Sequence, residues 1–270
     1  MSLSLSSTQL DRYSRHIIIE EIGPEGQAAL LDSRVLVVGA GGLGAPVIQY
    51  LAAAGVGTLG VVDDDTVERS NLQRQVIHAD GDVGRPKVES AADFVADLNP
   101  DVTVEPHEQR LTPENAADRV ADADVVVDAT DNFPTRYLLN DACALAETPL
   151  VNGAVYKFEG QATTIVPDGP CYRCLFPEAP DPSTVPDCAT TGVLGALPGT
   201  IGCLQATEVV KLLADIGDPL VGTLLSYDAM ELAVERVPYQ QSADCPVCGN
   251  NGIDSVAEVE YREGCRVTSE

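Results

Sequence analysis

The feature that most constrains the fold is a glycine-rich turn between a strand pattern and a helix pattern. Residues 34–38 read Arg-Val-Leu-Val-Val and lead directly into Gly39-Ala-Gly-Gly-Leu-Gly44. An alanine-rich helix pattern then runs from Leu43 to about Gly55. Glycines at these positions allow a tight turn and a close approach of the backbone to phosphates at a helix N-terminus. The turn therefore predicts the start of a nucleotide-binding βαβ unit; the alternative is a tight turn that binds nothing.

The rest of the chain alternates in a way that favours an α/β fold. Strand-like runs lie at 58–62, 102–105, 125–128 and 150–151, and helix-like stretches lie at 87–98, 113–120 and 135–146. After Gly153 the rhythm changes to strand-like runs at 161–166, 223–227 and 231–237, with a helix at 199–214. We expect a Rossmann-like, mostly parallel sheet with helices on both faces, extended by a mixed C-terminal half.

The amino-acid composition limits which partners the protein can bind and indicates its compartment. The 270 residues hold 42 acidic against 16 basic side chains, a formal net charge of −26, and the acidic residues are spread along the whole chain. An evenly acidic, solvated surface is typical of adaptation to high salt, and it repels nucleic acid and anionic membranes. The polar N-terminus and the absence of a long apolar run predict a cytoplasmic chain without a membrane span. Eight cysteines in such a chain favour metal ligation or catalysis over disulfides.

Charged residues follow the second strand pattern. Asp63 ends that pattern, where a carboxylate can bond a ribose hydroxyl. Arg74 lies in the segment 70–75, and Lys87 begins the next helix pattern. A guanidinium and an ammonium could grip a triphosphate, although two surface cations offsetting an acidic face fit the spacing equally well. The glycine turn and Asp63 alone also fit an NAD-dependent oxidoreductase with a structural zinc.

Asp131 and Asn132 follow the strand pattern at 125–128, at the edge of the sheet where open α/β folds bind ligands. Asp131 could hold Mg²⁺ against phosphates, because Mg²⁺ prefers a few carboxylates together with substrate oxygens. The alternative is that one of the two residues caps the helix that follows. Both interpretations can hold together.

Seven of the eight cysteines divide into three groups, and Cys265 lies in a polar tail that indicates no role for it. Cys171-Tyr-Arg-Cys174 and Cys245-Pro-Val-Cys248 predict a tetrahedral zinc site without an open position, hence structural; the alternatives are a redox dithiol or incidental buried cysteines. Cys143 and Cys203 lie in apolar helical patterns, so we expect them to be buried and inert. Cys188 follows a Pro/Asp-rich stretch and could act as a nucleophile, with a spectator thiol as the equal alternative.

Taken together, these segments resemble the ThiF/MoeB/HesA family of ubiquitin-activating-type adenylyltransferases, over about residues 10–248. With its acidic composition, the chain is most similar to halophilic archaeal members that activate small ubiquitin-like modifier proteins. The matching segments are, in order, Arg12-Tyr-Ser-Arg15, Gly39-Ala-Gly-Gly-Leu-Gly44, Asp63-Asp-Asp-Thr-Val67, Ser70-Asn-Leu-Gln-Arg-Gln75, Gly84-Arg-Pro-Lys-Val88, Asp128-Ala-Thr-Asp-Asn132, Cys171-Tyr-Arg-Cys174 and Cys245-Pro-Val-Cys248.

The resemblance implies a single adenylation domain over 1–270, with a nucleotide-binding half at 39–150, a carrier-binding and zinc half at 151–248 and a tail at 249–270. It implies that Arg15 enters the active site of a partner subunit in a homodimer. It implies that the cysteine pairs staple the crossover region through zinc, and that Cys188 accepts the activated carrier. The residues implied to bind ATP and Mg²⁺ are Gly39, Gly41, Gly42, Gly44, Asp63, Ser70, Asn71, Leu72, Gln73, Arg74, Lys87, Asp131 and Asn132.

The implied chemistry is ATP-dependent adenylation of the C-terminal glycine carboxylate of a small ubiquitin-like or sulfur-carrier protein that ends in Gly-Gly. Arg15, Arg74 and Lys87 would neutralise charge that develops on the phosphates. Cys188 would then displace AMP and form a thioester, although some relatives pass the adenylate directly to a sulfur donor. The product would feed protein conjugation, or sulfur transfer into tRNA thiolation or molybdopterin synthesis, with a separate sulfurtransferase supplying the sulfur.

Overall fold

One eight-stranded sheet crosses the whole molecule, in the order β3-β2-β1-β4-β5-β6-β7-β8. The computed structural model describes residues 5–177, 192–250 and 252–261. The first five strands of that order run parallel and the last three join antiparallel. The strands are β1 (Arg34–Val38), β2 (Thr58–Val62), β3 (Thr103–His107), β4 (Val125–Asp128), β5 (Leu150–Tyr156), β6 (Glu159–Ile165), β7 (Thr223–Asp228) and β8 (Ala233–Pro238). The expected mostly parallel sheet with a mixed C-terminal extension is confirmed.

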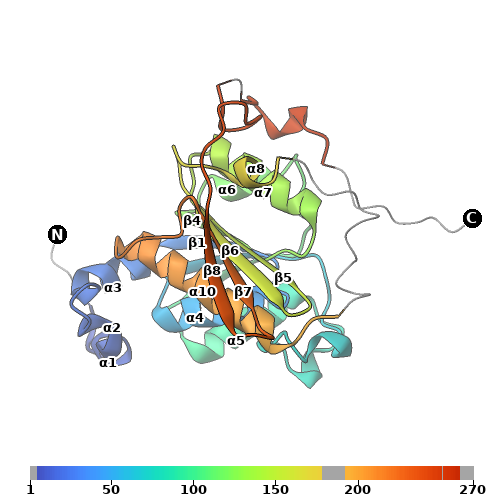
Figure 1. Cartoon of the computed structure of the whole chain (residues 1–270). Helices are drawn as coiled ribbons and strands as arrows, with labels where there is room; N and C mark the ends of the chain where they lie inside the picture. The colour runs from blue at the N-terminus through green and yellow to red at the C-terminus, as the bar shows by residue number, and fades with distance from the viewer. Residues whose placement is uncertain (1–4, 178–191, 251, 262–270) are drawn as a thin grey trace, which may run out of the picture.

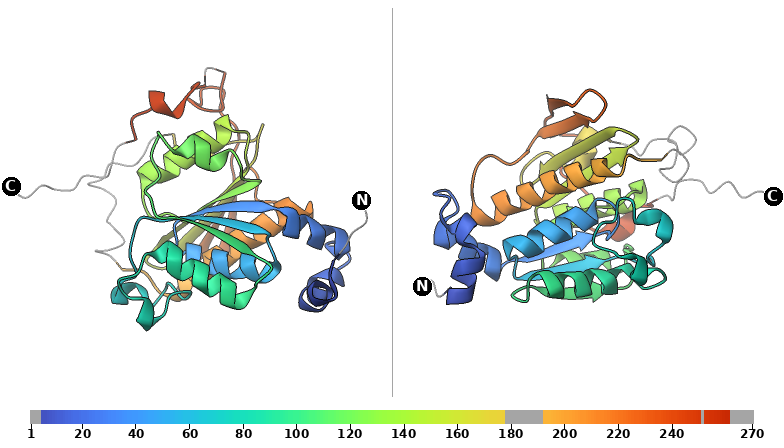
Figure 2. Two further views of the ribbon diagram at one scale, coloured as in Figure 1. Left: turned by 180° about the vertical axis from the view of Figure 1, so that it is seen from behind. Right: turned by 90° about the horizontal axis from the view of Figure 1, so that it is seen from below.

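Helices cover both faces of the parallel part (Figures 1 and 2). One face is covered by α3 (Gly23–Asp32), α4 (Gly44–Ala54), α5 (Lys87–Leu98) and α10 (Ala196–Ala214), and the other by α6 (Ala116–Val120), α7 (Phe133–Leu145) and α8 (Tyr172–Leu175). In β1, Val35 and Val37 join the first core while Leu36 and Val38 join the second, because successive side chains of a strand point to opposite faces. Burial on both faces explains the unbroken apolar run that the sequence shows.

The polar N-terminal segment is helical. It forms α1 (Ser7–Arg12) and α2 (Ser14–Ile17) before α3. A capping box starts α1: Gln9 N–H donates to Ser6 Oγ at 3.2 Å, and Ser6 N–H donates to Gln9 Oε1 at 3.0 Å. Tyr13, buried between the two helices, anchors them to the body, since its hydroxyl accepts from Asn99 Nδ2 at 2.9 Å. Long-range contacts of this kind are not visible in a local pattern.

The outermost strand β8 differs from the rest of the sheet. Every residue of β8 is exposed, so neither face of this strand is covered within the described part of the chain. Short 3₁₀ turns occur at η1 (Arg69–Asn71), η2 (Asp80–Asp82) and η3 (Val256–Glu258). Among the described residues no helix combines the length and apolar character needed to span a membrane. What matters for the site is that β1, β2 and β4 all end at one edge of the sheet.

Candidate nucleotide site and cysteine cluster

The glycine turn joins the end of β1 to the start of α4, as predicted. Gly39 has φ +99°, and a Cβ there would lie 2.7 Å from the carbonyl oxygen of Ala129. A Cβ on Gly44 would lie 1.9 Å from the carbonyl oxygen of Gly39, so the turn cannot close with any other residue at 44. Gly42 meets only ordinary or slightly tight contacts, the nearest at 3.3 Å. Gly39 and Gly44 therefore shape the turn, whereas Gly42 lies against Pro198 of α10 and the side chain of Arg74.

Asp63, Asp65 and Lys87 converge beside this turn. The carboxylate of Asp63 accepts the N–H of Ala40 at 2.7 Å and the N–H of Asp65 at 2.8 Å. Lys87, only 4% exposed, donates from Nζ to Asp65 Oδ2 at 2.7 Å and lies 3.9 Å from Asp63 Oδ1. Burial raises the pKa of Asp63, and the nearby Lys87 ammonium opposes that rise. The predicted cation therefore lies next to the predicted ribose ligand, at the carboxyl edge of the sheet.

The segment 70–75 lies across the glycine turn. Arg74 donates from Nη2 to Asn71 Oδ1 at 3.0 Å, and its Cδ would be 3.4 Å from a Cβ on Gly42. On its other side the segment touches the start of α10, because a Cβ on Gly195 would lie 2.3 Å from Gln73 Oε1. The sequence-predicted residues Ser70, Asn71, Leu72, Gln73 and Arg74 are thus held near the glycine turn by contacts on two sides.

Asn132 and Asp131 have separate roles in the structure. Asn132 is the N-cap of α7, where its Oδ1 accepts the N–H of Thr135 at 3.0 Å, so the capping interpretation is confirmed. Asp131 is exposed, and no hydrogen bond or ion pair joins its side chain to the described part of the chain. Its carboxylate is therefore available to a cation at the carboxyl edge of β4.

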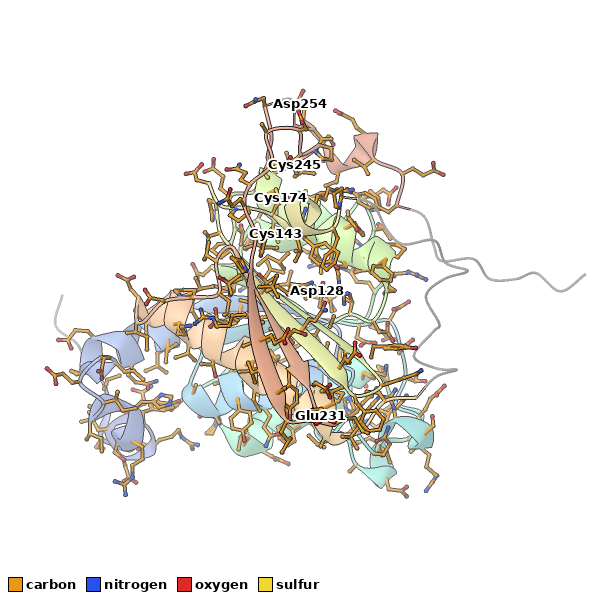
Figure 3. The ribbon with its side chains drawn as sticks, in the orientation of Figure 1. Asp128, Cys143, Cys174, Glu231, Cys245 and Asp254 are labelled. Atoms are coloured by element: carbon orange, nitrogen blue, oxygen red, sulfur yellow. The ribbon has the colours of Figure 1, made fainter. Side chains whose placement is uncertain are left out.

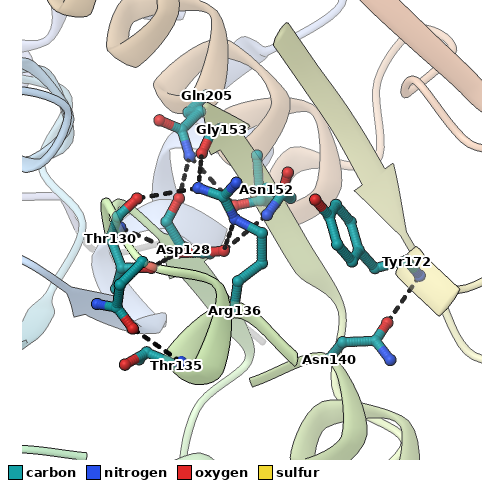
Figure 4. A network of polar contacts seen from close by, with 11 residues as sticks. Asp128, Thr130, Thr135, Arg136, Asn140, Asn152, Gly153, Tyr172 and Gln205 are labelled. Carbon is teal, nitrogen blue, oxygen red and sulfur yellow. Dashed lines mark hydrogen bonds and ion pairs between the residues drawn. The ribbon is translucent and has the colours of Figure 1, made fainter. Parts of the chain in front are cut away.

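A buried network under this edge was not predicted (Figure 4). Asp128, fully buried, accepts from Thr130 Oγ1 at 2.6 Å, Asn152 Nδ2 at 2.6 Å and Arg136 Nε at 3.1 Å. Arg136 also donates from Nη2 to the carbonyl oxygens of Thr130 at 3.0 Å and Gly153 at 3.1 Å. Burial works against the charge of Arg136, but the Asp128 carboxylate outweighs it and raises the pKa. The network fixes the loop that carries Asp131.

Arg15 lies away from all of these residues. It is exposed on α2, a helix held at the opposite edge of the sheet, where Tyr13 packs under Gly55 at the end of α4 (Figure 1). Tyr13 also donates from its hydroxyl to Asp101 Oδ2 at 3.3 Å, near the end of α5. The described part of one chain therefore does not bring Arg15 to the glycine turn.

The cysteine pairs meet as predicted, although they lie far apart in the sequence (Figure 3). The sulfur atoms of Cys171, Cys174, Cys245 and Cys248 all lie within 4.8 Å of one another. Individual S···S distances are 3.3 Å, 3.5 Å and 3.9 Å. Tetrahedral zinc with Zn–S bonds near 2.3 Å needs separations of about 3.8 Å. The cluster therefore fits zinc, and its four thiols leave no open ligand position.

The helix that carries the first cysteine pair is fixed to α7. Arg173 donates to both carboxylate oxygens of the fully buried Asp141, at 2.7 Å and 2.6 Å. Tyr261 donates to the same carboxylate at 2.8 Å, and Val256 packs into the same core. The described part of the tail, for which the sequence predicts no role, thus packs on the cysteine region.

The other cysteines give mixed outcomes. Cys143 is buried, and burial raises the pKa of its thiol, which confirms the expectation of an inert residue. Cys203 is only half-buried, although burial also raises its pKa. Cys188, the predicted nucleophile, lies outside the described residues.

Comparison with known proteins agrees with this arrangement. A family model described as the ThiF family matches residues 13–247. A SAMP-activating enzyme E1 of Haloferax volcanii is 69% identical over 268 residues, 99% of each chain. A sulfur carrier protein adenylyltransferase of Thermus thermophilus is 52% identical over 263 residues, 95% of this chain and 97% of that one. The adenylyltransferase and sulfurtransferase MOCS3 of Sus scrofa is 48% identical and is matched over only 57% of its length.

Solved structures support the fold. The crystal structure of E. coli MccB with ATP superposes with a TM-score of 0.79 at 24% identity, covering 90% of this chain and 75% of that one. SeMet PaaA superposes with a TM-score of 0.76 at 22% identity, covering 90% and 77%.

Proposed function

Because the chain belongs to the ThiF family, we propose that it uses ATP to adenylate the C-terminal glycine of a small ubiquitin-like or sulfur-carrier protein. The observation that carries the proposal is the convergence of Asp63, Arg74 and Lys87 on the glycine turn. The relatives named as a SAMP-activating enzyme and a sulfur carrier protein adenylyltransferase support this activity. They give no support to an NAD-dependent oxidoreductase, which also has less need of two cations beside the turn.

In this proposal the phosphates of ATP lie against the glycine turn and the ribose against Asp63. Lys87 leaves the exposed carboxylate of Asp65 to reach a phosphate, and Arg74 approaches from the segment above Gly42. Mg²⁺, bound through Asp131, would neutralise further phosphate charge. A carboxylate oxygen of the carrier attacks the α-phosphorus, and the bond to the bridging oxygen breaks as pyrophosphate leaves. The two cations stabilise negative charge that increases on the phosphate oxygens during this step.

We further propose a homodimer in which Arg15 of one subunit completes the site of the other. The distance between α2 and the glycine turn within one chain supports this arrangement. Mixing inactive Arg15→Ala and Lys87→Ala chains should restore activity, because a mixed dimer contains one site with both residues. Mixed dimers that stay as inactive as either parent would contradict the trans arrangement.

For the second half of the chain, 151–248, we propose that it binds the carrier and holds a structural zinc ion. We also propose that the protein is cytoplasmic. Cys188 would attack the carbonyl carbon of the acyl-adenylate, form a thioester and release AMP. A carrier conjugate that reductant cleaves and that Cys188→Ser abolishes is the expected result. A conjugate that survives this substitution would place the thioester elsewhere. The thioester would serve protein conjugation, or sulfur transfer with a separate sulfurtransferase.

The adenylation itself is tested by ATP–pyrophosphate exchange in high salt with Mg²⁺. Exchange should require a carrier that ends in Gly-Gly, and a carrier that lacks the final glycine should give none. If the protein is folded and no carrier that ends in Gly-Gly supports exchange, the proposed function is wrong.

A further inference from the structure

His78 is buried among the elements that carry the proposed nucleotide ligands, yet the adenylation proposal assigns it no role. It is 6% exposed and follows the segment 70–75. Its Nε2 lies 3.0 Å from the carbonyl oxygen of Ala40 in the glycine turn. Its Nδ1 lies 2.8 Å from Oγ of Ser90, on the first turn of α5. One imidazole therefore joins the glycine turn to the helix that begins with Lys87.

The contacts determine the tautomer. A carbonyl oxygen only accepts, so Nε2 must carry the proton that is donated to Ala40. Nδ1 is then the acceptor, and the Ser90 hydroxyl donates to it. The neutral imidazole satisfies both partners; in the imidazolium Nδ1 would instead donate to Oγ of Ser90, so protonation reverses this hydrogen bond.

The peptide of Ala40 is held from both sides. Its N–H donates to Asp63 Oδ2 at 2.7 Å, and its carbonyl oxygen accepts from His78 at 3.0 Å. These two bonds leave the turn little freedom to rotate about Ala40. The orientation of the amides that follow, up to Gly44, therefore depends on two side chains that come from outside the turn.

The charges around the ring favour the neutral form on balance. Burial lowers the pKa of His78 from its usual 6.5, and the hydrogen bond to Ala40 opposes that effect. Lys87 of α5 also lowers it, while Asp82 of η2 and Asp63 after β2 raise it. A proton added to His78 would put a second positive charge beside the buried Lys87.

We propose that His78 is a positioning residue for nucleotide binding, which holds the glycine turn against α5 in the arrangement that ATP meets. The nucleotide part rests on the proposed adenylation function. His78 touches the backbone of Ala40 and the hydroxyl of Ser90, and it acts on ATP through them. Loss of its hydrogen bonds leaves the carbonyl of Ala40 without its partner, so that Asp63 alone holds this residue, and weakens ATP binding without removing any phosphate ligand.

The test compares three variants of the full-length protein in high salt. His78→Phe keeps a ring but removes both hydrogen bonds, and His78→Gln can still donate to Ala40. His107→Gln is the control: the backbone carbonyl of His107 accepts from Asp63, but its side chain lines a cavity with Arg34 and Arg119. Binding of ATP with Mg²⁺ should weaken roughly tenfold in His78→Phe. It should weaken about threefold or less in His78→Gln and stay unchanged in the control. In exchange assays the KM for ATP should rise while kcat at saturating ATP stays near the original value.

Acidification provides a second readout. In the unchanged protein, ATP affinity should fall as the pH drops below the usual histidine value of 6.5, because protonation reverses the hydrogen bond to Ser90 and adds a positive charge near Lys87 at the start of α5. The part of that fall that His78→Gln removes belongs to this imidazole. An identical pH profile in both proteins would overturn the proposal.

Hydrogen exchange separates this proposal from the function on which it rests. Without nucleotide, the amides of residues 40–44 should exchange faster in His78→Phe than in the unchanged protein, with the core amides of β1 unaffected. Equal exchange in the turn, or equal ATP affinity in a folded His78→Phe, would overturn the role of His78. An unchanged protein that binds no ATP at all would instead refute the adenylation proposal, and the exchange rates would still decide whether His78 holds the turn.

Discussion

Two groups of charged residues, one at the glycine turn and one beneath the cysteine cluster, differ in what their partners can do. At the turn, the buried Lys87 is paired with Asp65, whose side chain is 68% exposed. On the other face of the sheet, Arg136 and Arg173 are paired with Asp128 and Asp141, whose side chains are fully buried. An exposed carboxylate can exchange its cation for water at little cost, whereas a buried one cannot. Lys87 can therefore leave Asp65 and bind a ligand, whereas Arg136 and Arg173 stay paired and stabilise the fold.

Removing the cysteine cluster should have the largest effect, because it releases the segment 245–248 from α8. Cys245→Ser should lose one bound zinc per chain and destabilise the fold by about 5 kcal/mol or more. Zinc content measured by mass spectrometry and thermal unfolding check this. Cys203→Ser, which changes a half-buried thiol outside the cluster, should keep both values. A Cys245→Ser protein that is as stable as the original would show that the cysteine cluster does not stabilise the fold.

The second largest loss of stability is expected when the ion pair between Arg136 and Asp128 is broken. Arg136→Met leaves Asp128 buried without its charged partner, which costs about 3–5 kcal/mol and lowers Tm by roughly 10 °C. Calorimetry measures the change. Arg85→Met is the matched control, because the side chain of Arg85 is 39% exposed in its pairs with Asp82 and Asp93. Similar losses in the two variants would mean that burial does not distinguish the two kinds of pair.

Lys87→Ala should show the opposite behaviour, with activity lost and the fold kept. Without Lys87 the pKa of Asp63 rises further, and the carboxyl group can become neutral instead of remaining a buried charge. We expect a loss of about 10²–10³ in the exchange rate, with a change in Tm of only a few degrees. Lys157→Ala, at an exposed turn, should retain activity. An unfolded Lys87→Ala protein would show that Lys87 is needed for folding.

The smallest effect on ATP binding and stability is expected from a change of Asp65, the exposed partner of Lys87. Asp65→Asn removes the negative charge that competes with phosphate for Lys87, so ATP should bind up to about fivefold more tightly. The fold should lose less than about 1 kcal/mol, because the pair is exposed on one side. Titration with ATP measures the first value and chemical unfolding the second. Weaker ATP binding in this variant would show that Asp65 supports Lys87 in the bound state.

The sequence predicts the parts of this molecule that depend on local pattern. The apolar runs predict the parallel strands, and the glycine turn is predicted because its residues are adjacent. The cysteine pairs are recognisable because their spacing is specific to metal binding. Arg136 and His78 could not be assigned in this way, because each satisfies partners from distant segments. A buried Arg eight residues after Asp128 looks like an ordinary helix residue until the fold shows what it contacts.

The N-terminal helices show the same limit. Their sequence is polar and short of apolar residues, and local propensity alone would leave them unstructured. They form against the body through Tyr13, which fills the space above Gly55, where φ is +83° and no side chain fits. The resemblance to a family implies that Arg15 reaches into the active site of a partner subunit, and no pattern in the sequence itself indicates where α2 lies.

Strand β8 ends the sheet, and no described strand pairs with its outer edge, which affects how the assembly of this protein should be measured. Leu232 and Val234 are 75% and 59% exposed beside or on that edge. Glu235 and Arg236 place charges on the strand, and Pro238 lacks an N–H to donate, which all discourage pairing with another chain. In dilute buffer the net charge of −26 adds a strong mutual repulsion, but concentrated salt screens it. A sedimentation experiment in ordinary laboratory buffer will therefore understate self-association, and only multimolar salt shows how well three side chains protect the edge.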